Sequence, residues 1–194
     1  MAVISFEQDI LNACNVLSKG GIILYPTDTV WGIGCDARFS DAVKRIYELK
    51  RRADSKAMIS LVADLDMLER YVKSDGVSLY RDVSKEFAKP VTLIYPRVEG
   101  VCSALLAENG SCGIRVSSER FSSLLCSGID GALVSTSANI SGEPTARFFS
   151  EISSAIIEGV DYVVHYRRDD IEEKESSAVV LVDSLTNQLK VLRP

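Results

Sequence analysis

Apolar residues recur at helical spacing in some segments of the chain and form short unbroken runs in others. Residues 6–19 place apolar side chains on one helical face, with Ser5 as the expected N-cap and Gly20 or Gly21 at the end. The run 21–25 is almost entirely apolar and stops at a proline, which predicts a buried strand. The chain is therefore expected to begin with a helix that leads into a sheet.

The rest of the chain predicts strands and helices in turn. A second helix has Ser40 as its expected N-cap and ends close to residues 50–52. Beyond it we expect strands near 57–62, 91–95, 112–116, 132–136 and 161–165, and helices near 64–72, 77–87, 119–127 and 148–157. The segments SSAVVLVD and QLKVLR, joined by SLTN, predict an antiparallel hairpin. This alternation predicts an α/β fold, a twisted open mixed sheet with helices packed on it.

Length and composition are typical of an ordinary globular protein. The chain has 194 residues, of which 46% are hydrophobic and 25% are charged, so we expect one domain over residues 1–194. No apolar run approaches the length that crosses a bilayer, and the N-terminus MAVISFEQDI is acidic where a signal peptide is basic. A cytoplasmic protein without a membrane role is expected.

Cysteine and histidine usage argues against metal and relay chemistry. The five cysteines are an odd number without a C-x-x-C pair, which predicts reduced thiols that act in packing: Cys14, Cys35, Cys102, Cys112 and Cys126. His165 is the single histidine and follows an apolar run, so a Cys/His zinc site or a Ser-His-Asp relay is hard to assemble. We expect no protein-bound metal and a structural role for His165.

Charge is distributed unevenly along the chain. The net charge of −5 argues against a large basic face, yet the segment 44–56, KRIYELKRRADSK, carries six basic residues against Glu48 and Asp54. A compact anionic ligand such as phosphate is one explanation, because Lys50 and Arg52 point the same way if the chain is extended there. The alternative is that these cations complement the dipole at a helix C-terminus and bind nothing.

Four segments place polar residues at strand ends, where open α/β sheets bind ligands. They read YPTDT, KPVT, GIRV and VSTSANISGEPT. YPTDT is also explained as a proline-initiated turn, and the serine-rich segment as a turn and helix cap. Arg115, inside GIRV, requires an acid or a ligand carboxylate, because an unpaired buried cation is costly.

Six segments in order resemble the YrdC-like family of L-threonylcarbamoyladenylate synthases across nearly the whole chain. They read ILYPTDTVWGIGCDA, ELKRRADSKAM, KPVTLIYP, GIRV, VSTSANISGEPT and SSAVVLV. The family's Lys-x-Arg and Ser-x-Asn signature matches residues 50–52 and 137–139. The resemblance implies a single YrdC-like domain without the extra C-terminal domain of some relatives.

The resemblance also implies a reaction. ATP, L-threonine and bicarbonate would give threonylcarbamoyl-AMP and pyrophosphate, with Mg²⁺ accompanying ATP. Partner proteins would then transfer the threonylcarbamoyl group to adenosine in tRNA, which the chain itself could also contact. A carbamate oxygen that attacks the α-phosphate needs no protein nucleophile, so alignment and cations are what the protein must supply.

Site residues follow from the resemblance position by position. Thr29 and Arg115 would bind L-threonine, with Arg115 on its α-carboxylate and Ser135 and Ser177 nearby. The cations for the departing pyrophosphate would be Lys50 and Arg52. The nucleotide side would be lined by Lys50, Arg52, Lys56, Ser111, Ser137, Asn139, Thr145 and Arg193.

The chain departs from the family pattern at two places. It has FAKPVT where relatives often have Trp-Pro-Gly-Pro before the VT strand, and SSERF where a proline and a histidine usually follow IRV. Two other functions stay open on sequence grounds. An RNA-binding module would use 44–56 as a basic face, and a non-catalytic nucleotide-binding relative would keep the pocket without turnover.

Overall fold

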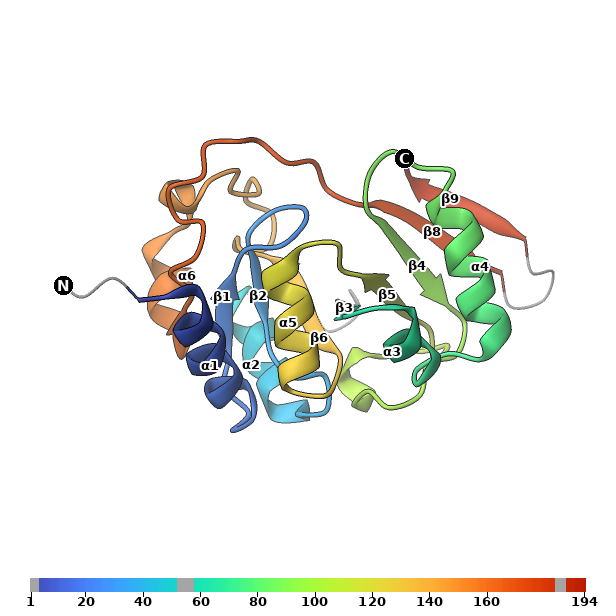
Figure 1. The fold of residues 1–194 in the computed structure, drawn as a ribbon, viewed down its shortest axis with the longest axis horizontal. Coiled ribbons are helices and arrows are strands. Elements are labelled where there is room, and N and C mark those ends of the chain that lie inside the picture. The colour runs from blue at the N-terminus through green and yellow to red at the C-terminus, as the bar shows by residue number, and fades with distance from the viewer. Residues whose placement is uncertain (1–3, 52–57, 184–187) are drawn as a thin grey trace.

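A mixed sheet of nine strands forms the centre of the computed structural model, which describes residues 4–51, 58–183 and 188–194 (Figure 1). Across the sheet, the strand order is β7-β1-β2-β6-β3-β5-β4-β8-β9. The strands are β1 Ile23–Tyr25, β2 Gly32–Gly34, β3 Ile59–Val62, β4 Val91–Tyr95, β5 Cys112–Val116, β6 Leu133–Ser137, β7 Tyr162–Val163, β8 Ala178–Val182 and β9 Leu189–Arg193. The predicted α/β class with a mixed sheet is confirmed.

Parallel and antiparallel pairs are both present in this sheet. The pairs β1–β7, β3–β5 and β4–β8 are parallel, whereas β1–β2, β2–β6, β3–β6, β4–β5 and β8–β9 are antiparallel. The predicted C-terminal hairpin is the antiparallel β8–β9 pair, and its predicted turn SLTN, residues 184–187, lies outside the described residues. Between β7 and β8 the chain crosses from one end of the sheet to the other, over the top in the view of Figure 1.

Helices cover the sheet and bury its apolar side chains. They are α1 Phe6–Leu17, α2 Ser40–Leu49, α3 Leu65–Glu69, α4 Ser74–Ser84, α5 Arg120–Gly128 and α6 Ser154–Gly159, with short 3-10 turns η1 Ser103–Leu105 and η2 Phe149–Glu151. Helix α1 packs against α5, and α2 packs against α6 and η1. A side chain at Gly128 would lie 2.6 Å from Cys14 Sγ, so this glycine permits the close approach of α5 to α1.

Two of the predicted helix starts differ in their caps. Ser5 caps α1 as expected, because its hydroxyl accepts a hydrogen bond from Gln8 N at 3.2 Å. Ser40 as a cap is wrong: it is the first residue of α2, and Phe39 is the N-cap without a side-chain hydrogen bond. The Phe39 ring packs beside Gly20, because a Cβ atom on that glycine would lie 3.5 Å from the ring.

Two other elements differ from the prediction: one helix is interrupted, and one strand was missed. The helix predicted at 148–157 is split into η2 and α6, because Ile152 and Ser153 adopt extended conformations between them. Strand β2 was not predicted. Its sequence is Gly-Ile-Gly, and two glycines with a single apolar residue, Ile33, are a weak strand signal. Hydrogen-bonded pairing with β1 on one side and β6 on the other stabilises the strand.

The described helices include none that is both long and apolar enough to cross a membrane. All five cysteines are free, and the described residues contain no group of three or more His, Cys, Asp or Glu side chains placed to hold a metal ion. His165 is exposed, and its backbone N–H donates to Asp9 Oδ2 at 2.8 Å.

The buried thiols are expected to act in packing alone. Burial raises the pKa of Cys112 to about 11 and that of Cys126 to about 12, and it raises the pKa of Cys35 as well, so these thiols stay protonated near pH 7. We expect single Ala substitutions at Cys35, Cys102 and Cys126 to lower the free energy of unfolding by about 1 kcal/mol and to leave turnover intact. Loss of turnover in a folded Cys35→Ala variant, measured beside its melting curve, would reveal a catalytic thiol.

Candidate active site

Strand register gathers polar side chains on one face of the sheet. Paired residues in neighbouring strands point to the same face, and so does every second residue along a strand. From β2 to β9 this places on one face Gly32, Ser137, Ser135, Ile59, Gly113, Arg115, Thr92, Val179 and Arg193. Thr92, Arg115 and Ser135 of this row are buried. Buried polar side chains need hydrogen-bond partners, so this row is a natural place for a ligand.

A cavity of about 180 Å³ lies over this row. Besides residues of the row, the loop after β1 and the residues before β8 contribute to its lining. The complete lining is Thr29, Val30, Trp31, Gly32, Met58, Ile59, Thr92, Arg115, Ser135, Thr136, Ser137, Thr145, Ser176, Ser177, Val179 and Arg193. The predicted threonine-site residues Thr29, Arg115, Ser135 and Ser177 all line it. Of the predicted nucleotide-site residues, Ser137, Thr145 and Arg193 line the same cavity.

The glycines of β2 leave room for the cavity and for the neighbouring strand. A Cβ atom on Gly32 would lie 3.2 Å from Ser135 Oγ and 3.3 Å from Thr27 Cγ2. On Gly34 it would lie 2.2 Å from the Val134 carbonyl oxygen, a separation that backbone atoms cannot accommodate. The Gly-x-Gly pattern of this strand is therefore required by close packing on the cavity face.

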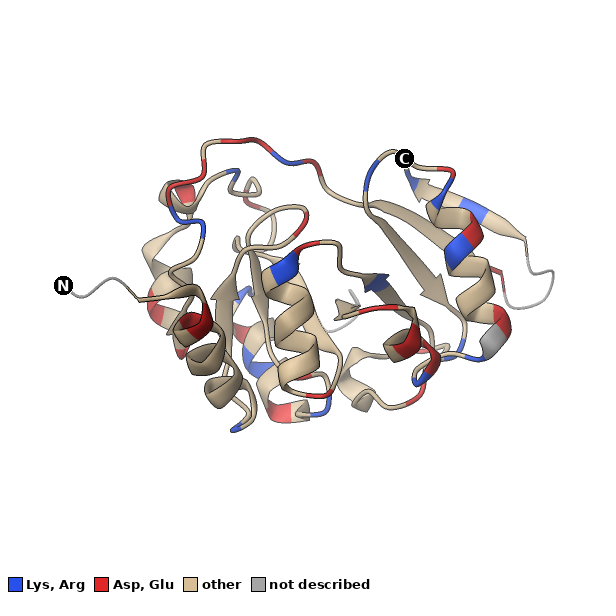
Figure 2. Cartoon of the chain, viewed as in Figure 1, with Lys and Arg blue, Asp and Glu red and all other residues tan. Residues whose placement is uncertain are grey.

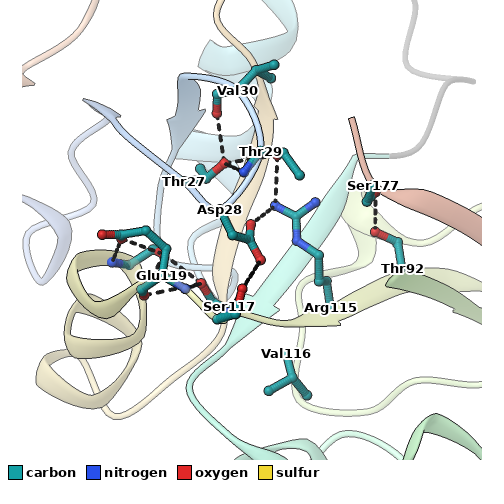
Figure 3. Close-up of polar contacts among 12 residues, drawn as sticks. Thr27, Asp28, Thr29, Val30, Thr92, Arg115, Val116, Ser117, Glu119 and Ser177 are labelled. Carbon is teal, nitrogen blue, oxygen red and sulfur yellow. Dashed lines mark hydrogen bonds and ion pairs between the residues drawn. The ribbon is translucent and has the colours of Figure 1, made fainter. Parts of the chain in front are cut away.

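Arg115 lies in the cavity wall, and Asp28 holds its guanidinium (Figure 3). Its Nη2 is 2.9 Å from Asp28 Oδ1 and 3.4 Å from Thr29 Oγ1, and the Arg115 and Asp28 side chains are 3% and 4% exposed. The sequence required an acid or a ligand carboxylate beside Arg115, and Asp28 is that acid. Arg115 Nε is buried and has no hydrogen-bond partner in the described ranges. A buried donor beside a cavity is suited to an acceptor that a ligand brings.

The YPTDT segment forms the turn that its proline and threonines predict. Thr27 Oγ1 accepts from Thr29 N at 3.0 Å and donates to the Val30 carbonyl oxygen at 2.8 Å (Figure 3). The hydroxyls of Thr27 and Thr29 are 3.0 Å apart. The turn and the ligand site are thus compatible, because the local bonds fix Thr29 in the cavity wall.

Arg193 brings a second cation to the cavity from the last strand. Its Nε donates to the Ser177 carbonyl oxygen at 2.8 Å, and its Nη2 lies 3.4 Å from Ser177 Oγ. Ser177 Oγ in turn is 2.9 Å from Thr92 Oγ1 (Figure 3). Desolvation, together with the charge of Arg115, lowers the pKa of Arg193 from its ordinary value. Two guanidiniums that repel each other across one cavity favour an anion between them.

Lys50 turns into the protein instead of toward the cavity. Its side chain is almost fully buried, and its Nζ donates to the carbonyl oxygens of Ser137 and Asn139, the latter at 2.6 Å. Its own carbonyl accepts from Ser141 N at 2.8 Å. Lys50 therefore holds the loop that follows β6, and its predicted contact with phosphate stays a prediction.

The remaining predicted nucleotide-site residues lie in different settings. Asn139 donates from Nδ2 to the Glu143 carbonyl oxygen at 2.8 Å, while its Oδ1 is buried without a hydrogen-bond partner in the described part of the chain. Ser111 is buried at the start of β5 and is not among the cavity residues. Arg52 and Lys56 fall outside the described residues.

Two further site residues lie in segments that the sequence singled out, although neither residue was predicted to belong to the site. Thr92 lies in KPVT and lines the cavity, and Asp28 lies in YPTDT and pairs with Arg115. Trp31, also in the lining, packs its ring 4.9 Å from that of Phe149. A charged residue next to two threonines was the available signal for Asp28, but its partner is 87 positions away and only the fold identifies it.

Comparisons with known proteins identify the family of this chain. The family model Sua5/YciO/YrdC, described as telomere recombination, matches residues 15–194. A threonylcarbamoyl-AMP synthase of Xanthomonas axonopodis pv. citri is 36% identical over 158 residues, 80% of this chain and 84% of the relative. One of Idiomarina loihiensis is 32% identical over 183 residues, 93% of this chain and 96% of the relative.

Solved structures share the fold at lower identity. P. abyssi Sua5 complexed with L-threonine superposes with a TM-score of 0.80 at 23% identity, covering 100% of this chain and 55% of Sua5. E. coli YciO gives a TM-score of 0.80 at 24% identity, covering 97% of this chain and 89% of YciO. With a family model that matches almost the whole sequence and relatives above 30% identity, the chain belongs to the Sua5/YciO/YrdC family.

Proposed function

We propose that the chain is an L-threonylcarbamoyladenylate synthase, a nucleotidyltransferase that acts in the cytoplasm and forms threonylcarbamoyl-AMP for tRNA modification. The observation that carries this proposal is the cavity in which Arg115, Thr29, Ser135 and Ser177 converge. Relatives named threonylcarbamoyl-AMP synthase and a fold neighbour complexed with L-threonine support it.

The cavity suits a small hydroxylated amino acid. At about 180 Å³ it is smaller than the ~300 Å³ at which pockets for larger ligands begin. The unpartnered Nε of Arg115 would donate to the α-carboxylate, and the hydroxyls of Thr29, Ser135 and Ser177 are available to the polar groups of threonine. The nucleotide would lie beside it, toward Ser137 and the exposed Thr145.

The proposed reaction needs cations that stabilise the negative charge of the departing pyrophosphate. Condensation of the threonine amine with bicarbonate releases water and gives a carbamate, whose oxygen then bonds to the α-phosphorus of ATP while the bond to pyrophosphate breaks. Negative charge accumulates on the leaving group, and we assign Arg52 and Arg193 to the side that receives it. Lys50 would act indirectly, because its Nζ is bound to the carbonyl oxygens of Ser137 and Asn139 and holds the loop after β6. Mg²⁺ would enter on the phosphates of ATP, since the described cavity lining contains hydroxyls and guanidiniums but no carboxylate.

Transfer to tRNA is proposed to need partner proteins. Lys and Arg positions are interspersed with Asp and Glu positions along the ribbon in Figure 2, and the segment that crosses above the sheet carries more acidic than basic residues. That distribution, with a net charge of −5, does not favour a long polyanion. A direct contact with tRNA would therefore be local.

Pyrophosphate release tests the proposed function. We expect the purified chain to release pyrophosphate from ATP and Mg²⁺ when both L-threonine and bicarbonate are present, and to release little when either is omitted. L-Serine, which lacks the methyl group, is the matched control substrate. Release that ignores threonine, or RNA binding with a steep salt dependence and no turnover, would contradict the proposal.

A further inference from the structure

A chain of polar contacts runs from the N-terminus of α5 to the cavity (Figure 3). Ser118 donates to Asp28 Oδ2 from both its backbone N and its Oγ, each at 3.3 Å. The other carboxylate oxygen of Asp28 is 2.9 Å from Arg115 Nη2. Asp28 therefore lies between Ser118 and Arg115, with Oδ2 facing Ser118 and Oδ1 facing Arg115.

The base of this chain is rigid. Glu119 is the N-cap of α5, and its carboxylate accepts from Ser122 N at 2.8 Å. Ser117 Oγ is 2.7 Å from Ser122 Oγ and accepts from Glu119 N at 3.3 Å. These bonds fix the turn between β5 and α5, and with it the position of Ser118. The turn is SSERF, the place where this chain departs from its family pattern.

We infer that Asp28, held by Ser118, is a positioning residue that fixes the guanidinium of Arg115 for an amino-acid carboxylate. An arginine has five donors in a planar fork, and the ion pair with Asp28 engages one of its nitrogens, Nη2, at 2.9 Å. With Nη2 held, the guanidinium keeps one orientation, its Nε remains without a hydrogen-bond partner among the described residues, and the ligand does not have to order the side chain on binding. The inference rests on the proposed function, since it concerns the threonine half of the same site.

A purely electrostatic role for Asp28 predicts the opposite change in threonine affinity, so the direction of the change distinguishes the two roles. If Asp28 only neutralised Arg115, then Asp28→Asn would uncover a cation and threonine would bind more tightly. If Asp28 orients Arg115, the same isosteric change frees the guanidinium and threonine binds more weakly. Ser118→Ala removes one of the two bonds from Ser118 and should have a smaller effect in the same direction.

The experiment measures L-threonine binding by calorimetry and the KM values for threonine and ATP at saturating co-substrate. We expect Asp28→Asn to raise the Kd and KM for threonine about tenfold, with kcat and the KM for ATP near those of the unmodified protein. The double variant Asp28→Asn/Ser118→Ala should bind threonine no more weakly than Asp28→Asn, because Ser118 acts through Asp28. Ser127→Ala, an exposed serine on the same helix that bonds the Ser123 carbonyl, is the control.

The outcomes separate this inference from the proposed function. Failure of the unmodified protein to bind threonine or to release pyrophosphate removes the proposed function, and with it the inference. Normal binding by the unmodified protein with tighter or unchanged binding by Asp28→Asn overturns the inference alone. Additive losses in the double variant would also overturn it. If Asp28→Asn does not fold, Ser118→Ala with equal losses for threonine and ATP overturns it as well.

Discussion

Replacing Arg115 with alanine is expected to weaken L-threonine binding by about ten- to hundredfold while ATP binding stays near that of the unmodified protein. The loss corresponds to the ~1.5 to 3 kcal/mol of a charge-assisted hydrogen bond to a carboxylate. Calorimetric titration of the two substrates measures it. Arg115 Nη2 lies 3.4 Å from Thr29 Oγ1, and both residues belong to the predicted threonine side of the cavity, so we expect the effect to be selective.

The alanine variant also leaves Asp28 buried without its cation, which destabilises the fold by about 3 to 5 kcal/mol if the carboxylate stays charged. Arg115→Lys is the matched variant, because it keeps a charge near Asp28 and removes the planar fork. We expect it to retain a cooperative melting transition and still to bind threonine more weakly. Unchanged threonine affinity in a folded Arg115→Lys variant, together with unchanged affinity in Arg115→Ala, would remove Arg115 from the site.

Replacing Lys50 with methionine is expected to lower the free energy of unfolding by about 3 kcal/mol. The change removes two part-buried hydrogen bonds of the charged Nζ, to the carbonyl oxygens of Ser137 and Asn139, and a hydrogen bond to a charged group contributes about 1.5 to 3 kcal/mol. The loop after β6 should loosen, so the KM for ATP should rise as well. Denaturant unfolding and ATP titration measure the two effects.

The control for Lys50 is Lys44→Met on helix α2. Lys44 is exposed and its ion pair with Asp41 spans 3.4 Å, so its removal should change stability little. If Lys50 contacts phosphate and does not support the loop, Lys50→Met will lose turnover with an unchanged unfolding free energy. That result would favour the phosphate clamp that the sequence suggested over the supporting role.

The sequence predicted most elements of this fold because their signals are local. Strands β4 and β5 begin and end where their apolar runs do, and Ser5 caps α1 as its side chain predicts. Strand β2 was missed because its glycines are selected by contacts with Val134 and Ser135, which belong to a strand 100 positions later. Local propensity carries no record of such contacts.

The same division applies to the site. Arg115 stood out because a charge within a strand needs a partner, and the residue types around Thr29 and Ser135 marked polar strand ends. Asp28 as the partner of Arg115, and the inward direction of Lys50, depend on how distant segments pack. Residue type predicted which segments carry the chemistry, and the fold determined which atoms face the cavity.

The position of β9 has a consequence for how the chain reaches its working state. The cavity takes Thr29 from the first strand connection and Arg193 from the last strand, so its wall spans nearly the whole sequence. Pairings between such distant residues form slowly, because the loops between them must be ordered first. During synthesis, the core around β1, β2 and β6 can assemble before the hairpin that carries Arg193 exists. Competence to bind an anion should therefore appear in refolding only after the bulk of the secondary structure, as a distinct late step.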